Sequence, residues 1–477
     1  MAVTRILQWL GNTLVIMAGL MVATAMVSLI LTDADSAVSL SIAAITTGLL
    51  GGIFVLATAN TPARESNLDA LVFLVLFWAV VPILGALPYL FLGVTESMTV
   101  AWFESVSAIT TTGASTLVPE EVPRAILVWR SLLQWLGGVI VATFAVVILA
   151  SLNLMGTGVH RSMLFTLRKG EFFYRLIGIG RVVAGLYGLI AAIGFIVMAA
   201  MGADVFDAFC LALSGTATGG LSTRSIPLAE FLPLGSSIAL ALVCLAGAVS
   251  IAAHWDLFRL RSLPEIRHFF RNVETRALVG ITAGLTLVGF AYTGFRHFTT
   301  VGLEAAFLAS SAGYDYNVIG LELLPPAILI TVALVGGSAL STAGGLKLIR
   351  LLLLFRHMRV DIERLTHPSR VKPVRFRGRI IQDSAFLSVW MYFFGYTLVF
   401  GIGTVVLGIT GLPYDVAVPA AAGSLSNVGP LLEANMVLQD WQDFTPLQLS
   451  ASAVLMLVGR VEVLAILAMI SPKLWIR

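Results

Sequence analysis

The sequence predicts an all-α polytopic membrane protein, in which two N-terminal helices precede four pseudo-repeats of a helix, a short pore helix with a turn, and a second helix. The first reason is composition. Of 477 residues, 58% are hydrophobic and only 12% are charged, and the mean hydropathy is +0.95. Soluble globular domains carry about 25% charged residues. The second reason is order along the chain, because short segments that end in glycine recur between long apolar stretches.

Ten apolar stretches approach the length of about 20 residues that a membrane span requires. They lie near residues 10–31, 38–58, 69–93, 129–154, 180–201, 233–254, 277–296, 325–355, 385–411 and 446–470. The first follows Arg5, as a signal peptide would follow a basic residue. It exceeds the roughly 7–15 apolar residues of such a peptide, and a second stretch follows at once. We therefore interpret it as the first of ten transmembrane helices.

Charged residues in the loops indicate the orientation. The loops after the fourth, sixth and eighth stretches are rich in arginine, whereas most of the acidic residues lie in the alternate loops. Lysine and arginine mark cytoplasmic loops in membrane proteins. We therefore expect both termini to be cytoplasmic and the short glycine-ended turns to lie near the opposite face.

Four short turns are the most informative feature of the chain. Each turn has a hydroxyl-bearing residue three places before a glycine. Each also follows an apolar segment that is too short to span the membrane. A turn buried in lipid can leave its carbonyl groups unpaired only where they line a cavity or bind a ligand. Four such turns on one axis could replace the hydration shell of a potassium ion. The predicted filter consists of Thr110, Thr111, Thr112, Gly113, Thr216, Ala217, Thr218, Gly219, Ser310, Ser311, Ala312, Gly313, Ser426, Asn427, Val428 and Gly429.

The segments before these turns are predicted to be pore helices. Their dipoles would direct negative ends toward the pore and favour a cation, and glycine permits backbone conformations that aim carbonyl groups at an ion. The hydroxyl groups of Thr110, Thr216, Ser310 and Ser426 could add a ring of oxygen ligands. The plainer interpretation of one such turn is close helix packing. Four in register favour a cation pore.

The eighth apolar stretch contains a glycine-rich segment that should interrupt its helix. Unwound backbone at this depth is tolerated only in a cavity, so we interpret the segment as a gate beneath the filter; the alternative is a packing seam. Arg460 lies inside the last stretch, where a charge is costly. It would form an electrostatic barrier below a cation filter, or else an ion pair with Glu462. The predicted gate comprises Gly336, Gly337, Ser341, Thr342, Gly344, Gly345, Lys347 and Arg460.

Several of these motifs together resemble the Trk/Ktr/HKT superfamily of potassium transporters. The resemblance covers the whole chain, and the two extra N-terminal spans are similar to the bacterial TrkH type rather than the shorter Ktr type. The matching segments are Phe103-Glu104-Ser105, Thr111-Thr112-Gly113-Ala114, Arg130-Ser131-Leu132-Leu133-Gln134-Trp135-Leu136-Gly137-Gly138, Thr218-Gly219-Gly220-Leu221-Ser222-Thr223, Ser341-Thr342-Ala343-Gly344-Gly345-Leu346-Lys347, Ser426-Asn427-Val428-Gly429-Pro430 and Gly459-Arg460-Val461-Glu462-Val463.

This resemblance implies potassium uptake across a bacterial inner membrane by a homodimer with one pathway in each protomer. It also implies a cytosolic nucleotide-binding regulatory subunit of the TrkA type. The transported ion is potassium, bound only at the filter; membrane lipid surrounds the chain, and we expect no organic cofactor and no nucleic acid. Both a channel-like transporter and a symporter fit. The third turn lacks the usual threonine-rich pattern, so a less selective sodium and potassium transporter is the alternative.

Two other classes of protein are weighed against transport. A membrane-embedded enzyme needs convergent nucleophilic, acid–base or metal-binding groups, and neither the two cysteines nor the six histidines have such spacing. A scaffold would not need four filter-like turns. The repeats divide the chain into residues 1–66 (two N-terminal helices), 67–178, 179–272, 273–380 (with the gating segment) and 381–477.

Overall fold

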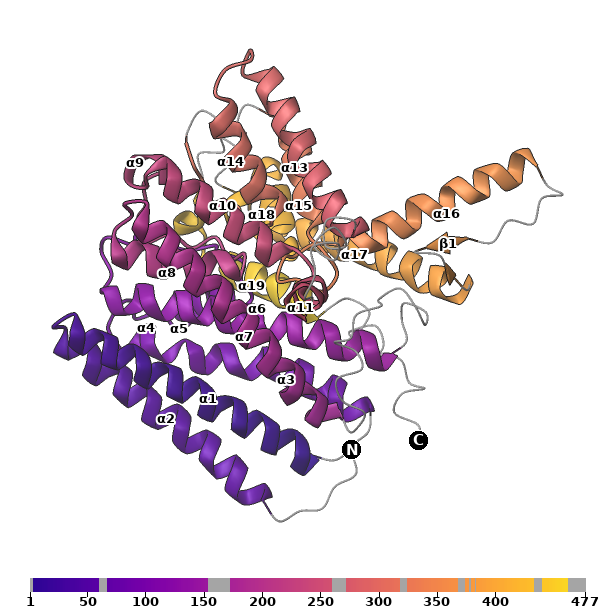
Figure 1. The fold of residues 1–477 in the computed structure, drawn as a ribbon. Coiled ribbons are helices and arrows are strands. Elements are labelled where there is room, and N and C mark those ends of the chain that lie inside the picture. The colour runs from indigo at the N-terminus through magenta and orange to yellow at the C-terminus, as the bar shows by residue number, and fades with distance from the viewer. Residues whose placement is uncertain are drawn as a thin grey trace.

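The computed structural model describes residues 3–59, 67–152, 172–259, 272–317, 324–367, 374–376, 379–381, 383–432 and 440–461. Most of this part of the chain is helical (Figure 1). The predicted all-α membrane class is confirmed. The exception is a short antiparallel pair of strands, β1 (Arg375–Phe376) and β2 (Arg379–Ile380).

The two N-terminal helices form a hairpin along one edge of the molecule (Figure 1). They are α1 (Val3–Ile30) and α2 (Ala34–Thr58). Asp33 begins the second helix, because its carboxylate accepts the Ser36 N–H at 3.0 Å. Glycines let the two helices approach closely, since a Cβ on Gly11 would lie 2.7 Å from the Gly51 carbonyl oxygen. The hairpin packs against the rest of the bundle through buried leucine and methionine side chains.

The remaining helices are described in four sets along the chain. The first set is α3 (Asn67–Gly85), α4 (Leu87–Phe91), α5 (Met98–Ile109) and α6 (Arg124–Leu152). The second is α7 (Phe172–Ala200), α8 (Val205–Thr216), α9 (Leu228–Phe231), α10 (Leu234–Ala248) and α11 (Ile251–Arg259). The third is α13 (Val273–Tyr292), α14 (Phe298–Ala309), α15 (Pro326–Val335) and α16 (Leu348–Thr366). The fourth is α17 (Asp383–Ile409), α18 (Tyr414–Ser426) and α19 (Pro446–Val461).

Seven continuous helices among the described residues are long and apolar enough to cross a membrane. An eighth is bent by 102° at the break between α10 and α11. The predicted span over 233–254 thus corresponds to α10 and the start of α11, with the bend between them. The stretch 325–355 is also interrupted, and 446–470 is described only as far as Val461. The count of ten transmembrane helices stays a prediction.

The non-helical segment 336–347, hereafter the intramembrane loop, explains the bend. The Ser338 N–H donates to the Ala248 carbonyl at 3.1 Å, and the Ile251 N–H donates to the Leu340 carbonyl at 2.7 Å. The broken ends of α10 and α11 thus find their hydrogen-bond partners in the loop. Such pairing is the condition on which irregular backbone is tolerated at this depth.

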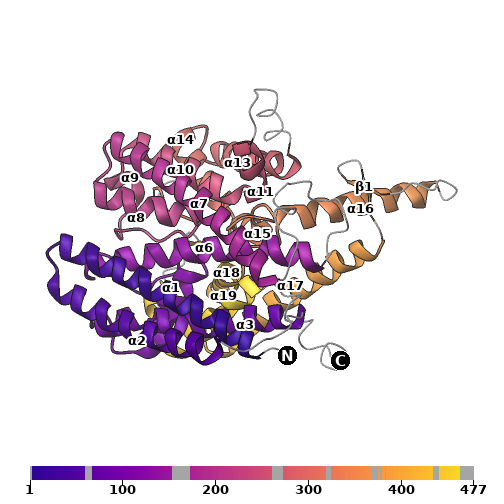
Figure 2. The ribbon, with the colours of Figure 1, turned by 60° about the horizontal axis from the view of Figure 1, so that its bottom comes forward.

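Helices α16 and α17 leave the bundle side by side (Figure 1), and a turned view shows them extending beyond the other helices (Figure 2). The apolar face of α16, with Leu353 and Leu354, packs against Phe386 and Val389 of α17 and against the ends of the strand pair. The predicted span 325–355 ends within α16, which continues as a helix to Thr366. The extension is amphipathic, with arginine and acidic residues on its exposed side.

Candidate ion pathway

The four short helices α5, α8, α14 and α18 end in the same unusual backbone conformation. In each turn a residue with a side chain adopts a left-handed conformation, which is uncommon outside glycine and is concentrated at functional sites. These residues have φ angles of 52° at Thr111, 52° at Thr218, 64° at Ser311 and 55° at Asn427. All four are buried. Their shared geometry aligns the four turns residue by residue.

This alignment corrects the predicted register of the second turn by one residue. The glycine two places after Thr218 is Gly220, with φ 77°, matching Gly113 at 84° and Gly313 at 69°. The predicted segment 216–219 placed Gly219 there instead. The reason is that α8 continues through Thr216 and Ala217 forms its cap. Two consecutive glycines in the sequence offered no means of choosing between them.

Backbone hydrogen bonds define the turns and set one of them apart. The N–H groups of Thr112, Gly219 and Val428 each reach back five residues, to carbonyls at 2.9, 2.9 and 2.8 Å. This is the Schellman pattern that closes helix C-termini. In the third turn the Gly313 N–H, one residue later, donates to the Phe307 carbonyl at 3.0 Å. The turn with the unusual sequence therefore also has a different hydrogen-bond pattern.

The turns touch one another in a closed ring. A Cβ on Gly113 would lie 2.1 Å from the Gly219 carbonyl oxygen, and one on Gly220 would lie 2.1 Å from that of Ala312. A Cβ on Gly313 would lie 3.0 Å from Val428 Cγ1. The ring closes where a Cβ on Gly429 would meet the Ala114 nitrogen at 2.1 Å. Segments more than 300 residues apart thus meet around one centre, and side chains at these glycines would separate them.

Three of the long helices reach this ring through glycines of their own. A Cβ on Gly137 of α6 would lie 1.9 Å from the Ile109 carbonyl oxygen. A Cβ on Gly247 would lie 2.3 Å from the Thr216 carbonyl oxygen, and a Cβ on Gly459 would lie 2.3 Å from the Leu425 carbonyl oxygen. In the corrected register, Ile109, Thr216 and Leu425 occupy equivalent positions. Close approach of a long helix to the ends of three of the four pore helices is thus an independent sign of their equivalence.

The hydroxyl groups predicted to form a ligand ring all donate within their own helices. Thr110 and Thr216 donate to carbonyls four residues earlier, both at 2.7 Å. Ser426 does the same at 2.5 Å, and Ser310 donates to Phe307 at 2.9 Å. Thr110 Oγ1 also accepts the hydroxyl of Thr112 at 2.7 Å, because its own proton is donated to Val106. In the corrected register, however, Ala217 rather than Thr216 aligns with Thr110, so only three hydroxyl groups lie at one level.

Side chains behind the turns hold several carbonyl groups in place, and the sequence reasoning did not assign them this role. Gln134 Nε2 donates to the Gly219 carbonyl at 2.7 Å, Trp441 Nε1 donates to that of Gly429 at 3.2 Å, and the Arg130 guanidinium donates to that of Ser222. All three are buried. Arg130 and Gln134 are polar residues in an apolar helix, which was the available signal, because buried polar side chains require partners.

Acidic residues on two pore helices anchor the chain segments that follow the turns. Glu104 accepts hydrogen bonds from the Thr116 N–H at 2.6 Å and from the Ser115 hydroxyl at 3.0 Å. Glu304 accepts the Asn317 N–H at 3.3 Å. These contacts stabilise the exit of the first and third turns. Both glutamates therefore support the pore helices from behind the turns.

The intramembrane loop lies against the ring and bonds to several repeats. The Gly344 N–H donates to Ser311 Oγ at 3.0 Å, and a Cβ on Gly344 would lie 1.6 Å from the Ser426 carbonyl oxygen. Thr342 Oγ1 lies 3.1 Å from Thr218 Oγ1 and donates to the Gly247 carbonyl at 3.1 Å. Further support comes from Glu274, which accepts the Ala339 N–H at 2.9 Å.

Arg460 connects the loop to the first turn. Its Nη1 donates to the Thr342 carbonyl at 2.7 Å. Its other nitrogens donate to the Thr110 carbonyl and to Thr111 Oγ1. The side chain is buried. Because Glu462 lies outside the described residues, the alternative of an ion pair with it stays untested.

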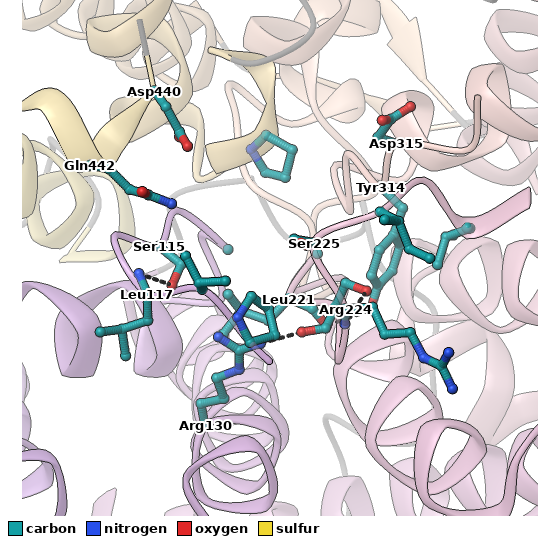
Figure 3. Close-up of a pocket in the computed structure, with 18 residues that line it drawn as sticks. Ser115, Leu117, Arg130, Leu221, Arg224, Ser225, Tyr314, Asp315, Asp440 and Gln442 are labelled. Atoms are coloured by element: carbon teal, nitrogen blue, oxygen red, sulfur yellow. Dashed lines mark hydrogen bonds between the residues drawn. The ribbon is translucent and has the colours of Figure 1, made fainter. Parts of the chain in front are cut away.

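A polar pocket of about 160 Å³ opens on the other side of the ring (Figure 3). Gly113 and Gly220 reach into it, and all four repeats contribute to its walls, including Ser115, Arg224, Asp315 and Asp440. Arg224 is paired with Asp207, 2.9 Å away. Partial burial raises the pKa of Asp440, and the neighbouring Asp443 adds to the rise. Burial likewise raises the pKa of Asp315. Two carboxyl groups therefore face a pocket that leads to the ring.

Four re-entrant turns in a closed ring, with a polar mouth on one side and an intramembrane loop on the other, define a multi-pass membrane protein of the ion-transport class. The comparisons agree, because the TrkH family of cation transport proteins matches residues 44–475. The chain belongs to this family, and it is a transporter rather than an enzyme.

Relatives and solved structures support the assignment over the whole chain. The Trk system potassium uptake protein TrkH of Escherichia coli K12 is 30% identical over 422 residues, covering 85% of this chain and 86% of the relative. The protein of the same name from Halomonas elongata is 30% identical over 496 residues and covers both chains fully. The crystal structure of the potassium transporter TrkH from Vibrio parahaemolyticus matches with a TM-score of 0.87, 28% identity and full coverage of both chains.

Proposed function

We propose that this chain takes up potassium ions through the ring of four turns. The single observation that carries the proposal is that ring, in which turns with one shared backbone conformation touch one another around a common centre. Backbone carbonyls arranged around such a centre can substitute for the water shell of an ion. Relatives described as potassium uptake proteins, 30% identical over most of the chain, support potassium as the cargo.

The proposed filter is the set of turn residues in the corrected register. It comprises Thr110, Thr111, Thr112, Gly113, Ala217, Thr218, Gly219, Gly220, Ser310, Ser311, Ala312, Gly313, Ser426, Asn427, Val428 and Gly429. The intramembrane loop and Arg460 form the proposed gate. Their position supports this assignment. The loop lies against Ser311 and the end of α18, and Arg460 contacts both the loop and the first turn.

A less selective pathway that also carries sodium is the second candidate. The third turn favours it, because its sequence is Ser310-Ser311-Ala312-Gly313 and its closing hydrogen bond is displaced by one residue. A change of backbone at one of four positions alters the number and field of the carbonyl ligands, on which discrimination between the two ions depends.

The proposed setting is a bacterial inner membrane, with both termini in the cytoplasm. Support comes from the arginine-rich loops on one side. We further propose a homodimer embedded in membrane lipid and a cytosolic nucleotide-binding subunit of the TrkA type that regulates it. The name Trk system, carried by the relatives, favours a multi-component transporter.

Growth at limiting potassium tests the function directly. The full chain, expressed in a bacterium that lacks its own potassium uptake, should restore growth in medium with micromolar potassium. The matched pair of variants Gly113→Ser and Gly284→Ser should differ, because a Cβ at Gly113 collides with the second turn, whereas one at Gly284 meets no atom within 4 Å. Failure of the parent chain to restore growth, although it is present in the membrane, contradicts potassium uptake.

A further inference from the structure

A large apolar groove lies away from the ion pathway, between α1, α3, α6 and α7. Its volume is about 680 Å³. Figure 1 shows α1, α3, α6 and α7 together in the lower half of the molecule. Aromatic and aliphatic side chains dominate the lining, among them Phe73, Phe77, Trp135 and Ile140. This groove has no part in the proposed transport mechanism.

The groove has the length of one membrane leaflet. Its lining on α1 runs from Trp9 to Leu20, which corresponds to about 16 Å at 1.5 Å per residue. The hydrocarbon core of a bilayer is about 30 Å thick, so the groove covers roughly half of it. In the proposed orientation this half is the cytoplasmic one, because α1 and α7 both begin on that side.

Arginine side chains gather toward the same end. Arg181 lines the groove and is exposed. Arg5 precedes Trp9 by one turn on α1, and its Nε is buried without a hydrogen-bond partner in the part of the chain that the structure describes. The same holds for Arg175 Nε, near the start of α7. Arg181 therefore lies within the groove, whereas Arg5 and Arg175 lie beside its cytoplasmic end, near the starts of α1 and α7.

We propose that this groove binds an anionic phospholipid of the cytoplasmic leaflet. An acyl chain lies against Trp135, Phe73 and Phe77, and the phosphate headgroup lies near Arg181 and Arg5. Two observations select this occupant: the groove ends at basic side chains, and its length fits one leaflet. Basic side chains next to a bilayer attract anionic lipid with about 1 kcal/mol each.

The position of the groove suggests a consequence for the pathway. Trp135 and Ile140 lie on α6, which also carries Gln134, the residue that holds the Gly219 carbonyl, and Gly137, which packs on the end of α5. A lipid bound to the outer face of α6 supports the helix that backs the first two turns. This inference goes beyond the proposed transport. Its test measures lipid binding and not ion flux, so the lipid site and the proposed transport can fail independently of each other.

Two variants and one control test the site in the purified full chain. Arg181→Gln removes a headgroup contact at an exposed position. Gly180→Phe fills the groove, since a Cβ at Gly180 would lie 3.6 Å from Thr143 Cγ2, an ordinary contact. Arg276→Gln is the matched control, because Arg276 is an exposed arginine in the first turn of α13, outside the groove lining. Melting temperature without lipid shows whether each variant is folded.

Native mass spectrometry and thermal shift with dioleoylphosphatidylglycerol or dioleoylphosphatidylcholine supply the readout. We expect the parent chain to bind phosphatidylglycerol more tightly than phosphatidylcholine. Arg181→Gln should weaken phosphatidylglycerol binding about fivefold, the effect of one basic residue, Gly180→Phe should remove retained lipid, and Arg276→Gln should match the parent. Equal binding of both lipids by the parent, or parent-like binding by both groove variants, overturns the proposal. Loss of a dimer in Gly180→Phe with lipid binding unchanged also overturns it, because the groove is then a protein interface.

Discussion

Arg460 Nη1 donates to the Thr342 carbonyl at 2.7 Å, which joins the last helix to the intramembrane loop. The same guanidinium also donates to the Thr110 carbonyl and to Thr111 Oγ1 in the first turn. One buried side chain therefore connects the proposed gate with the proposed filter. A movement of the loop that breaks the contact with Thr342 leaves a guanidinium group free to change position below the ring.

Replacing Arg460 by alanine should raise potassium flux, because it removes a positive charge from the path of a cation. A tenfold increase corresponds to about 1.4 kcal/mol taken from the barrier. Arg460→Lys separates charge from bridging, since lysine keeps the charge but not the planar fork that reaches three partners. Flux is measured at equal protein density and driving force. Low flux in Arg460→Lys with high flux in Arg460→Ala supports a barrier; reduced flux in both variants means that the arginine is structural.

Deleting residues 337–344 should also raise flux, because the loop is proposed to obstruct the pathway. A Cβ on Gly344 would lie 1.6 Å from the Ser426 carbonyl oxygen, so the loop fits tightly against the ring. The Ile251 N–H, which donates to Leu340, would need water as a new partner. Single-channel or liposome flux, with elution volume as the test of folding, provides the measurement. A folded deletion variant that conducts no faster than the parent would falsify the gate assignment.

Gly113→Ser should lower the preference for potassium over sodium by roughly tenfold. The φ angle of 84° is unfavourable for serine, at about 1–2 kcal/mol, and the new Cβ would press on the Gly219 carbonyl. The permeability ratio from reversal potentials is the quantity to measure. Gly284→Ser is its control, with open space around the added atom. An unchanged ratio in Gly113→Ser counts against the first turn as a filter element.

Uptake should fall as the external pH falls, through protonation of Asp440 at the polar mouth. Its raised pKa means that the carboxylate takes up a proton at a higher pH than an ordinary aspartate, and protonation removes a charge that attracts cations. Asp440→Asn should lower uptake at neutral pH and weaken the pH dependence. Asparagine retains the cap to the Trp441 N–H. If Asp440→Asn shows the same pH dependence of uptake as the parent chain, Asp440 is not the group whose protonation lowers uptake.

The basic stretch that begins in the second half of α16 and continues beyond it is predicted to bind the regulatory subunit. Residues 356–379 contain eight basic and two acidic residues; Arg377 lies outside the described residues. The stretch includes the end of α16, and α16 follows the intramembrane loop directly. A bound subunit could therefore bias the loop through its differential affinity for two states. Neutralising Arg375, Arg377 and Arg379 should weaken subunit binding in a pull-down and leave flux without the subunit unchanged. Intact binding and regulation in the triple variant would exclude this surface.

The fold class and the four pore helices were predictable because membrane solvation imposes strong constraints on sequence. Only helices can satisfy the backbone across lipid, so long apolar stretches and short glycine-ended ones translate almost directly into elements such as α5 (Met98–Ile109). The break between α10 and α11 was not predictable. It depends on hydrogen bonds to Ser338 and Leu340, nearly a hundred residues away, and the sequence around Val249 contains no proline.

Within the site, the types of residue in the turns were easier to predict than the register of the turns or the side chains that hold them in place. The choice of Gly220 over Gly219 depends on where α8 ends, which its own sequence specifies only to within a residue or two. The roles of Gln134 and Arg130 come from contacts with a turn some 90 residues later in the chain. Polar residues in an apolar helix signal that a partner exists, but only the packing of α6 against α8 identifies it.

Ion flux through the purified chain in liposomes, with potassium and sodium gradients imposed in separate experiments, tests the central claim most directly. The account predicts flux driven by a potassium gradient, a smaller flux driven by sodium, and a reduced difference between the two in Gly113→Ser but not in Gly284→Ser. Absence of potassium flux from folded protein, or equal fluxes of both ions that Gly113→Ser leaves unchanged, would contradict a selective pathway through the ring of four turns.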